Sequence, residues 1–350
     1  MAYDADRQVQ IDSIFRIASM TKPITVVAVM MLYEAGHFSL DTPISAFIPS
    51  FKTMQILTHK DNLETNLAVA HTAITIRHLL THTAGLSYND DEGDFLGRKY
   101  EEAFLALEKT TDKLTLGQWV NTIATLPLAN EPGTAWRYGF SIDVLAHLVE
   151  IISGLPFDQY LQERIFAPLQ MKDTAFHVPP EKAHRIASVH RYFADEDRLE
   201  RGDFPWLRIP QEAPSYIEGG NHLVSTAPDY AHFAQMLLNK GEWQGVRLLK
   251  PETIDLIRQN HLTTKVLHNG FIDPRFPRNE SYGFGLGMRV LMDNRQPGGI
   301  GSFGWDGLYG TVFWVDPKNG LFGLMMIQQF GPPHQEIRQN FQTIVYQALA

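Results

Sequence analysis

The stretch Phe15-Arg16-Ile17-Ala18-Ser19-Met20-Thr21-Lys22-Pro23 places a serine and a lysine three residues apart at the start of an expected helix, Ser19 to Ala35. Side chains three positions apart on a helix lie on the same face, so the Ser19 hydroxyl and the Lys22 amine are within reach of each other. A neutral lysine in apolar surroundings can accept the proton of a serine nucleophile. The pattern also fits a serine that caps a helix and a lysine that lies on the surface.

Tyr138 is a second candidate, in the sequence PGTAWRYGFS at residues 132–141, directly before an expected helix that begins at Ser141. A phenol held in such a turn can relay protons between a serine and a leaving group. A tyrosine that only packs a loop onto a helix has the same pattern. Tyr138 by itself therefore leaves both interpretations open.

The spacing of apolar residues differs between two parts of the chain. Before about residue 280, capped segments with helical spacing are found at 19–35, 75–83, 115–126, 141–152, 157–165 and 226–239. After about residue 281, strands are predicted at 282–292, 311–315 and 321–329, followed by a last helix at 335–349. Strands gathered at one end, with helices elsewhere, are typical of an α+β fold in which an antiparallel sheet is flanked by helices. We therefore expect a single unit: residues 1–60 and 281–350 form an α/β region that holds the sheet, and residues 61–280 form a mostly helical region with insertions.

Composition excludes several classes of function. The chain has 350 residues, no cysteine, and 39 acidic against 30 basic residues, so its net charge of −9 disfavours a phosphate-backbone partner. Without cysteine there is no disulfide, thiolate metal site or cysteine nucleophile. No early apolar stretch is long enough to span a membrane, and the start lacks the pattern of a signal peptide. We expect a cytoplasmic protein that binds neither nucleic acid nor membrane.

Two further patterns are interpreted as structural. Gly299 to Gly304 has the glycine spacing of a dinucleotide site, but a strand rather than a helix is expected next, so no helix N-terminus is available for a pyrophosphate. His78 and His82 are four residues apart, as zinc ligands can be, but a following glutamate and a third ligand are not evident. We expect His78 to be half-buried and His82 to cap a helix or fix a loop. The sequence predicts neither a cofactor nor a metal.

Five segments in order along the chain resemble the serine β-lactamase and penicillin-recognising superfamily. The resemblance is closest to its esterase branch, the family VIII carboxylesterases, which are similar to class C β-lactamases. The segments are FRIASMTKP at 15–23 (first motif), TIRHLLTHTAGL at 75–86 (a structural helix), EPGTAWRY at 131–138 (second motif), Gly219-Gly220 with 223–230, and Trp305-Asp306-Gly307, where this branch often carries Trp-x-Gly. Five ordered matches over about three hundred residues make chance implausible.

The resemblance implies an acyl transfer in two steps. Ser19 would attack a carbonyl carbon, Lys22 and Tyr138 would share the proton transfers, and water would hydrolyse the acyl-enzyme. The backbone N–H groups of Ser19 and Leu308 would hold the oxyanion, with Leu308 on or near the strand that follows the third motif. No cofactor is required, and whether Lys22 or Tyr138 is the base stays open at the level of the family. The substrate would contact Trp305, Asp306, Gly307 and Phe140.

The chain departs from the family pattern in three places. Phe140 lies where β-lactamases commonly carry asparagine, and the third motif has Asp306 and no lysine to pair with a β-lactam carboxylate, which favours neutral esters. Relatives place a helix and two strands before the nucleophile, whereas eighteen residues precede Ser19 here, so we expect those elements to be missing. The apolar strand at 321–329 would then become a sheet edge.

The expected activity is that of a carboxylesterase that cleaves short-chain or otherwise small acyl esters through an acyl-enzyme on Ser19. A β-lactamase, a D-Ala-D-Ala peptidase, and an acyltransferase that uses an alcohol other than water are the alternatives on the same fold. A binding scaffold without turnover is disfavoured because Ser19, Lys22 and Tyr138 are all present. The expected partner is a small-molecule ester, and assembly into a homo-oligomer is left open.

Overall fold

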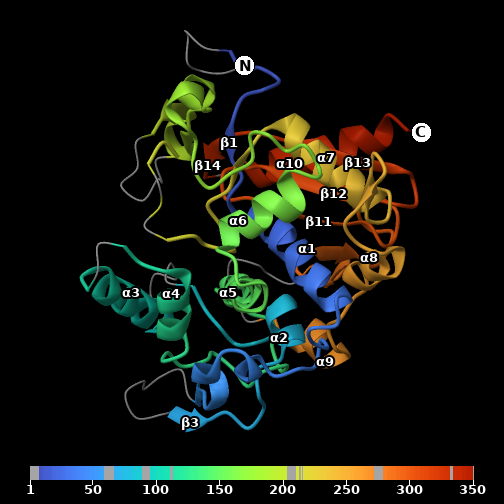
Figure 1. Ribbon diagram of the computed structural model, residues 1–350. Coiled ribbons are helices and arrows are strands. Elements are labelled where there is room, and N and C mark those ends of the chain that lie inside the picture. The colour runs from blue at the N-terminus through green and yellow to red at the C-terminus, as the bar shows by residue number, and fades with distance from the viewer. Residues whose placement is uncertain are drawn as a thin grey trace.

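The computed structural model describes residues 8–58, 67–88, 95–110, 113–202, 210–212, 214, 216–271, 279–331 and 334–349. Helices and strands are mixed in the way the sequence predicts, and the fold is of the α+β class (Figure 1). Its largest sheet is built entirely from the C-terminal part of the chain. Lys22 lies on the helix Thr21–Glu34 (α1), below the sheet in the view of Figure 1, whereas Trp305 and Asp306 lie in the sheet itself.

The main sheet has five antiparallel strands in the order β13-β12-β11-β10-β9. Their bounds are Tyr282–Phe284 (β9), Arg289–Leu291 (β10), Phe303–Asp306 (β11), Val312–Asp316 (β12) and Leu321–Met325 (β13). Every connection is between neighbours, so the sheet is a meander. The turn predicted at residues 316–320 joins β12 to β13.

Two strand predictions were wrong in detail. The segment 282–292 is a hairpin of β9 and β10, because the chain reverses at Gly285-Leu286-Gly287, where Gly287 has a φ of +71°. The segment 321–329 divides into β13 and β14 (Gln329–Phe330), and β14 joins another sheet beside β4 (His190–Phe193). The strand β11 was not predicted, because its first residues were examined only as a glycine pattern.

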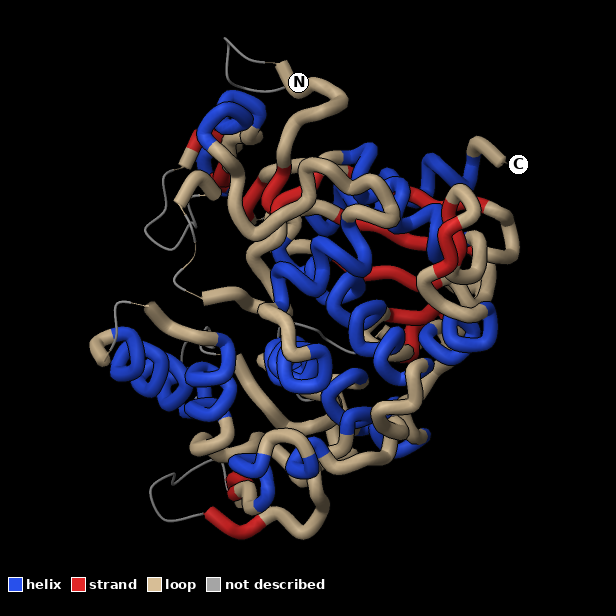
Figure 2. The backbone as a smooth tube through the Cα atoms, viewed as in Figure 1, coloured by secondary structure: helices blue, strands red, loops and turns tan. Residues whose placement is uncertain are grey.

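Within the described residues, β13 pairs with β12 on one side and with no strand on the other. The tube in Figure 2 shows the red strands of this sheet beside the blue C-terminal helix. Adjacent residues of a strand point to opposite faces, and Phe313 packs on Tyr230 of α7 whereas Trp314 packs on Phe341 of α10. The helices α7 (Ala227–Leu238) and α10 (His334–Gln347) therefore cover opposite faces of the sheet.

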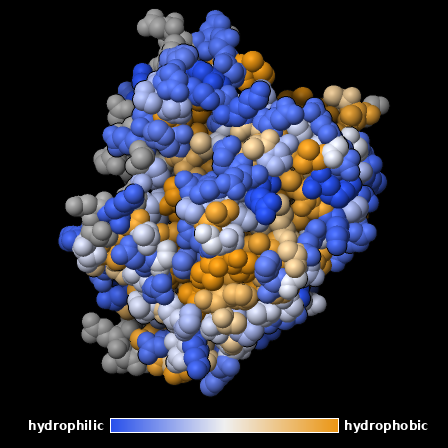
Figure 3. Space-filling model, in the orientation of Figure 1, coloured by the Kyte–Doolittle hydropathy of each residue, from blue (hydrophilic) through white to orange (hydrophobic). Residues whose placement is uncertain are grey.

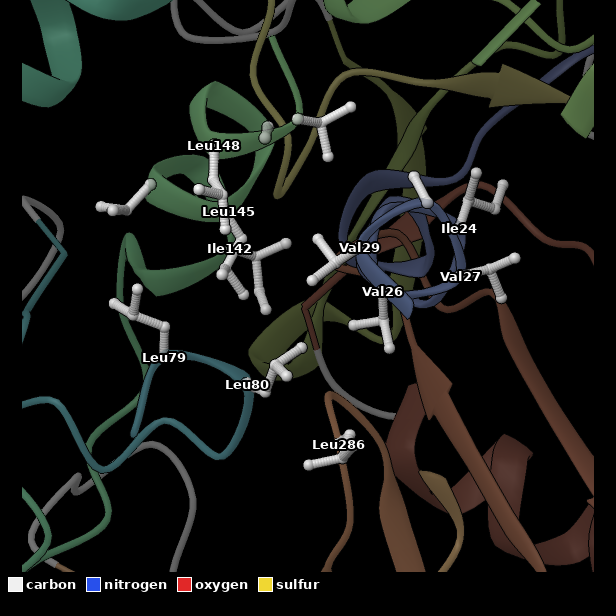
Figure 4. Close-up of a cluster of buried hydrophobic side chains, with 14 of the residues drawn as sticks. Ile24, Val26, Val27, Val29, Leu79, Leu80, Ile142, Leu145, Leu148 and Leu286 are labelled. Atoms are coloured by element: carbon white, nitrogen blue, oxygen red, sulfur yellow. The ribbon is translucent and has the colours of Figure 1, made fainter. Parts of the chain in front are cut away.

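The helix α1 (Thr21–Glu34) lies in the centre of the molecule and is buried almost all round. Figure 4 shows Val29 directed toward Ile142 and Leu145 of α5 (Ser141–Ser153), with Val27 on the other side of α1. A helix that is apolar on every side is stable only inside a core. The central position of α1 holds its N-terminal end, and the residues there, in a fixed place.

The remaining helices and strands surround this centre. The helices are α2 (Ile76–Leu80), α3 (Phe95–Glu108), α4 (Leu116–Ile123), α6 (Phe157–Leu161), α8 (Pro251–Ile257) and α9 (Thr264–Asn269). The small strand pairs are β1 (Phe15–Arg16) with β6 (Val224–Ser225), β2 (Gln55–Leu57) with β3 (Leu67–Val69), β4 with β5 (Arg198–Arg201), and β7 (Glu242–Trp243) with β8 (Val246–Arg247).

Capping residues placed several of these helices correctly. Thr75 and Thr115 each form a capping box, and Thr226 accepts a hydrogen bond from the Asp229 N–H at the start of α7. The helix predicted at 157–165 has two parts in the structure. Its first part is α6, and a π-helical turn at Gln162–Phe166 follows directly. Three helices, α3, α8 and α9, were not predicted.

The surface in Figure 3 is largely hydrophilic, with apolar side chains gathered over the region of α5. Among the described helices, none has both the length and the apolar character that a membrane crossing requires. The described residues also contain no group of three or more acidic or histidine side chains that could hold a metal ion.

Candidate active site

Ser19 lies in a single 3₁₀ turn, Ala18–Met20, that leads into α1, so it precedes the helix and does not cap it. The backbone bends sharply in this turn, since Ala18 has a φ of +44°, a value that residues other than glycine rarely adopt. Strain of this kind is often found at functional sites. The Ile17 N–H donates to the carbonyl of Leu223, which fixes the approach to the turn, and Ser19 itself is half-buried.

Lys22 is fully buried in the first turn of α1, although lysine is almost never buried unless its charge is paired. Its Nζ lies 3.0 Å from the Ser19 Oγ and donates to the carbonyl of Gly220 at 2.6 Å. The structure thus brings Ser19 and Lys22 together as the spacing predicted, and Lys22 is not a surface lysine. Burial disfavours the charged amine, while the carbonyl and hydroxyl oxygens give it hydrogen-bond partners.

Tyr138 belongs to the same cluster. Its ring lies with its centroid 4.7 Å from the Lys22 Nζ, and its hydroxyl accepts a hydrogen bond of 3.2 Å from the Trp305 Nε1. The segment that carries it is fixed from behind, because the Arg137 N–H donates to the carbonyl of His82. Tyr138 therefore connects the Ser19–Lys22 pair with the third motif.

The third motif follows the course of β11 into a tight turn. Trp305 and Asp306 end the strand, and the Gly310 N–H donates to the carbonyl of Gly307. A side chain at Gly307 would collide with the carbonyl of Ile17, so the turn packs directly against the approach to Ser19. Leu308 lies at the tip of this turn, between β11 and β12 rather than on the following strand, and is 48% exposed.

Asp306 is flanked by two arginines, which the sequence analysis did not foresee. Its carboxylate lies 3.4 Å from a guanidinium nitrogen of Arg289 and 3.4 Å from one of Arg338. Arg338, on α10, also donates to the carbonyls of Gly307 and Gly310. Burial lowers the pKa of Arg338, and the carboxylate of Asp306 opposes this effect. The third motif therefore has two cations beside it although it contains no lysine.

Phe140 does not lie beside Ser19 and Lys22, where substrate contact was expected of it. It is buried and packs against Tyr88, Tyr100 and Trp119, with ring centroids 4.5 to 6.0 Å away. Tyr88 lies between it and the centre of the site, 5.3 Å from the Tyr138 ring and 5.5 Å from the Lys22 Nζ. The residue in the position expected of Phe140 is therefore Tyr88, which the sequence analysis missed.

His78 is half-buried, as expected, but it also takes part in a helix cap, a role that was expected of His82. His78 is the third residue of α2, and its Nδ1 accepts a hydrogen bond from the N–H of the cap residue Thr75. Burial lowers the pKa of His78. His82 is fully buried, with its ring 4.7 Å from Tyr138 and 5.7 Å from Phe284. It packs behind the tyrosine, and within the part of the chain that the structure describes it belongs to no group of three ligand-type side chains.

Two charged residues next to the site, Asp143 and Arg338, were not among the predicted site residues. Asp143, in the first turn of α5, is buried, and its Oδ1 accepts a hydrogen bond of 3.0 Å from the Gly220 N–H. An aspartate inside the apolar sequence SIDVLAHLV was a signal, because a buried carboxylate needs a partner. Arg338 gave no signal, since its contacts lie about thirty residues away in the chain.

Comparison with known proteins shows the family of the chain as a whole. The family model described as Beta-lactamase matches residues 2–347. The chain is 30% identical to monacolin J acid methylbutanoyltransferase of Aspergillus terreus, over 96% of this chain and 83% of that protein. It is 28% identical to Esterase EstB of Burkholderia gladioli, over 92% of this chain and 79% of that protein.

The solved structures give the same answer for the fold. Unliganded simvastatin synthase (LovD) from Aspergillus terreus superimposes with a TM-score of 0.81 at 27% identity, covering 99% of this chain and 87% of that one. The family match spans nearly the whole chain, and the relatives include both an esterase and an acyltransferase. The chain therefore belongs to the Beta-lactamase family, as a serine hydrolase or acyltransferase of that fold.

Proposed function

We propose that this protein is a carboxylesterase that cleaves short-chain or otherwise small acyl esters through an acyl-enzyme on Ser19. The observation that carries the proposal is the hydrogen bond of 3.0 Å between the buried Lys22 Nζ and the Ser19 Oγ. A serine is a weak nucleophile until a neighbouring base takes its proton. Lys22 lies in hydrogen-bond reach for that transfer.

Each proton in the reaction has a place to go. As the Ser19 oxygen bonds to the carbonyl carbon, its proton passes to the Lys22–Tyr138 pair, which then returns it to the departing alkoxide. Water repeats the sequence in the second step and releases the acid. The N–H groups of Ser19 and Leu308 would hold the oxyanion, a role that the close packing of the Gly307 turn on Ile17 supports.

The preference for small esters follows from the aromatic surroundings. Tyr138 packs against Tyr88 on one side and Trp305 on the other, beside Lys22, so apolar ring surfaces border the place where a small acyl group would lie. The Trp305 N–H donates to the Tyr138 hydroxyl, which fixes the phenol while its ring lies beside Lys22. A carboxylate on the substrate would meet Asp306, which already pairs with Arg289 and Arg338 and so competes with the substrate for these cations.

Transfer of the acyl group to an alcohol other than water is the second candidate. It is favoured by the identity of 30% to a methylbutanoyltransferase, and it uses the same acyl-enzyme. The two activities differ only in which nucleophile reaches the acyl carbon. Added small alcohols would divert the acyl group into a new ester if the second candidate holds, and would leave the yield of acid unchanged if water alone is used.

A fluorophosphonate probe tests the nucleophile directly. The protein should be labelled at Ser19, and Ser19→Ala should lose both the label and at least about a thousandfold of its p-nitrophenyl butyrate hydrolysis. The half-buried Ser19 side chain is small, so circular dichroism of the variant should match that of the parent. Ser302, buried and bonded to the Gly299 carbonyl, provides the control: Ser302→Ala should still be labelled. Labelling that persists in Ser19→Ala would place the nucleophile elsewhere.

A further inference from the structure

Gly220 connects two buried charged groups that come from different helices. Its N–H donates to the Oδ1 of Asp143 on α5 at 3.0 Å, and its carbonyl accepts from the Nζ of Lys22 on α1 at 2.6 Å. Asp143 and Lys22 are 1% and 0% exposed. One residue thus holds a carboxylate and an amine in place at the same time.

The space around Gly220 admits no side chain. A Cβ there would lie 2.8 Å from the Asp143 Oδ2 and 3.3 Å from the Lys22 Nζ, so the two groups face each other across the glycine hydrogens. The preceding residue is held equally closely, because the Thr25 hydroxyl donates to the carbonyl of Gly219 at 2.5 Å. The segment is therefore clamped between α1 and α5 and cannot move without disturbing Lys22.

Among the described residues, the charges that act on Asp143 are those of Glu218 and Lys22. On its own side is Glu218, whose carboxylate accepts from the Tyr216 hydroxyl at 2.5 Å and lies 3.4 Å from the His222 Nε2. Across Gly220 is Lys22, with the rings of Tyr88 and Tyr138 beyond it. Burial and Glu218 raise the pKa of Asp143 to about 7, and Lys22 acts in the opposite direction.

We propose that Asp143 is a positioning residue for the Ser19–Lys22 pair: it fixes Gly220, whose carbonyl holds Lys22, and its negative charge favours the protonated amine. Since only the neutral amine can help to take the Ser19 proton, Asp143 sets the pH above which the pair becomes active. This inference rests on the proposed function, because it needs Ser19 to be the nucleophile. Asp143 touches no reacting atom and transfers no proton itself.

Asp143→Asn is the decisive variant, because asparagine keeps an oxygen for the Gly220 N–H and removes only the charge. Without that charge Lys22 should lose its proton at a lower pH. The acidic limb of the pH profile of kcat/KM for p-nitrophenyl butyrate should therefore move down by about one pH unit, with little change in KM. The rate of fluorophosphonate labelling should shift in the same way.

A carboxylate elsewhere on α5 provides the matched control. Glu150 pairs with His147 and accepts the Phe157 N–H, away from Lys22, so Glu150→Gln should leave the profile where it is. A profile of Asp143→Asn that overlays the parent would overturn the proposal. A loss of activity at all pH values without a shift would also overturn it, since that is what mere structural damage produces.

Glu218→Gln decides the matter if Asp143→Asn does not fold. Glutamine can still accept from Tyr216, and without the Glu218 charge Asp143 ionises at lower pH. The acidic limb should then move toward higher pH in the range below 7, because Lys22 faces a charged Asp143 more of the time. An unchanged profile would refute the role of Asp143. Failure of the proposed function is recognised separately, as a parent protein that the probe does not label.

Discussion

The two sides of the candidate site are built in different ways. The lysine side, consisting of Lys22, Gly220 and Asp143, is fully buried between two central helices. The turn side, consisting of residues 305–308, reaches the surface at Leu308 and is held by Arg338, a long side chain from the last helix. Buried polar groups must be hydrogen-bonded, so their geometry is nearly fixed, whereas an exposed turn can adapt to different substrates.

This difference separates two kinds of effect. Changes on the lysine side should alter the chemical step, because the groups there handle the proton of Ser19. Changes on the turn side should alter how the substrate and its oxyanion are held. Kinetic measurements on single variants distinguish the two kinds of effect.

The largest effect is expected at Lys22 and Tyr138, the two groups proposed to handle the proton of Ser19. Lys22→Ala and Tyr138→Phe should each lower kcat for p-nitrophenyl butyrate by about a thousandfold with KM nearly unchanged, as expected for loss of a general acid–base group. Because the two residues act as one proton-transfer unit, the double variant should be little slower than either single variant. Lys99→Ala, at an exposed ion pair, is the control and should be fully active. Losses that add in free energy would refute the shared role.

An intermediate effect is expected where α10 holds the turn. Arg338→Lys keeps the charge but cannot donate to both the Gly307 and Gly310 carbonyls while it pairs with Asp306. The turn should loosen, and kcat/KM should fall about tenfold, less than the loss that removal of an oxyanion donor causes. Arg295→Lys, an exposed arginine with two acidic partners, serves as the control. Equal kinetics for Arg338→Lys and the parent would show that the turn needs no such tether.

A smaller effect concerns the charge of the substrate. Carboxylate-bearing β-lactams should be turned over far more slowly than neutral esters of similar size. Asp306→Asn should narrow this gap by roughly fivefold, since removing one partly solvated charge is worth about 1 kcal/mol. The same substitution also removes the carboxylate that pairs with Arg289 and Arg338. The ratio of kcat/KM for a penicillin and a butyrate ester measures the effect, and a ratio near one in the parent protein would contradict it.

The smallest effect is on stability. Because the folded protein raises the pKa of Asp143 to about 7, the folded state binds the proton more tightly than the unfolded chain does. The contribution of Asp143 to stability is therefore fully present below about pH 4 and is lost as the pH rises through 7. The melting temperature of the parent should fall by about 2 °C relative to Asp143→Asn between pH 5 and pH 7.5. If the melting temperatures of the two proteins changed equally with pH over this range, Asp143 would not be a buried carboxylate with a raised pKa.

Local patterns were sufficient for much of the fold. The threonine caps at Thr75, Thr115 and Thr226 marked the starts of three helices, because capping depends only on residues within one turn. The hairpin turn at 316–320 joins two strands as predicted. The strand predicted at 282–292 was wrong because glycines at 285 and 287 reverse the chain, and the apolar pattern alone did not reveal this.

In the site, too, contacts between residues close in the chain were predicted and contacts between distant residues were not. Ser19 and Lys22 are one helical turn apart, so the sequence by itself brought them together, and the resemblance of the later motifs added Tyr138 and Trp305. Gly220 and Arg338 could not be assigned in this way, since they reach the site from 198 and about 30 residues along the chain from their partners. Tyr88, rather than Phe140, faces Lys22, and the Phe140 ring packs against Tyr88.

The sequence by itself determined the class of fold, the nucleophile candidate and its nearest amine, because these follow from caps, periodicity and the reach of side chains within a helical turn. Only the tertiary structure decided the electrostatic environment of Ser19 and Lys22. Whether Lys22 is buried, which carbonyl holds it, and which carboxylate stands behind it depend on how α1 packs on α5 and on the segment at 219–220. Packing of this kind is set by the shape and burial of many residues at once, and no single stretch of the chain records it.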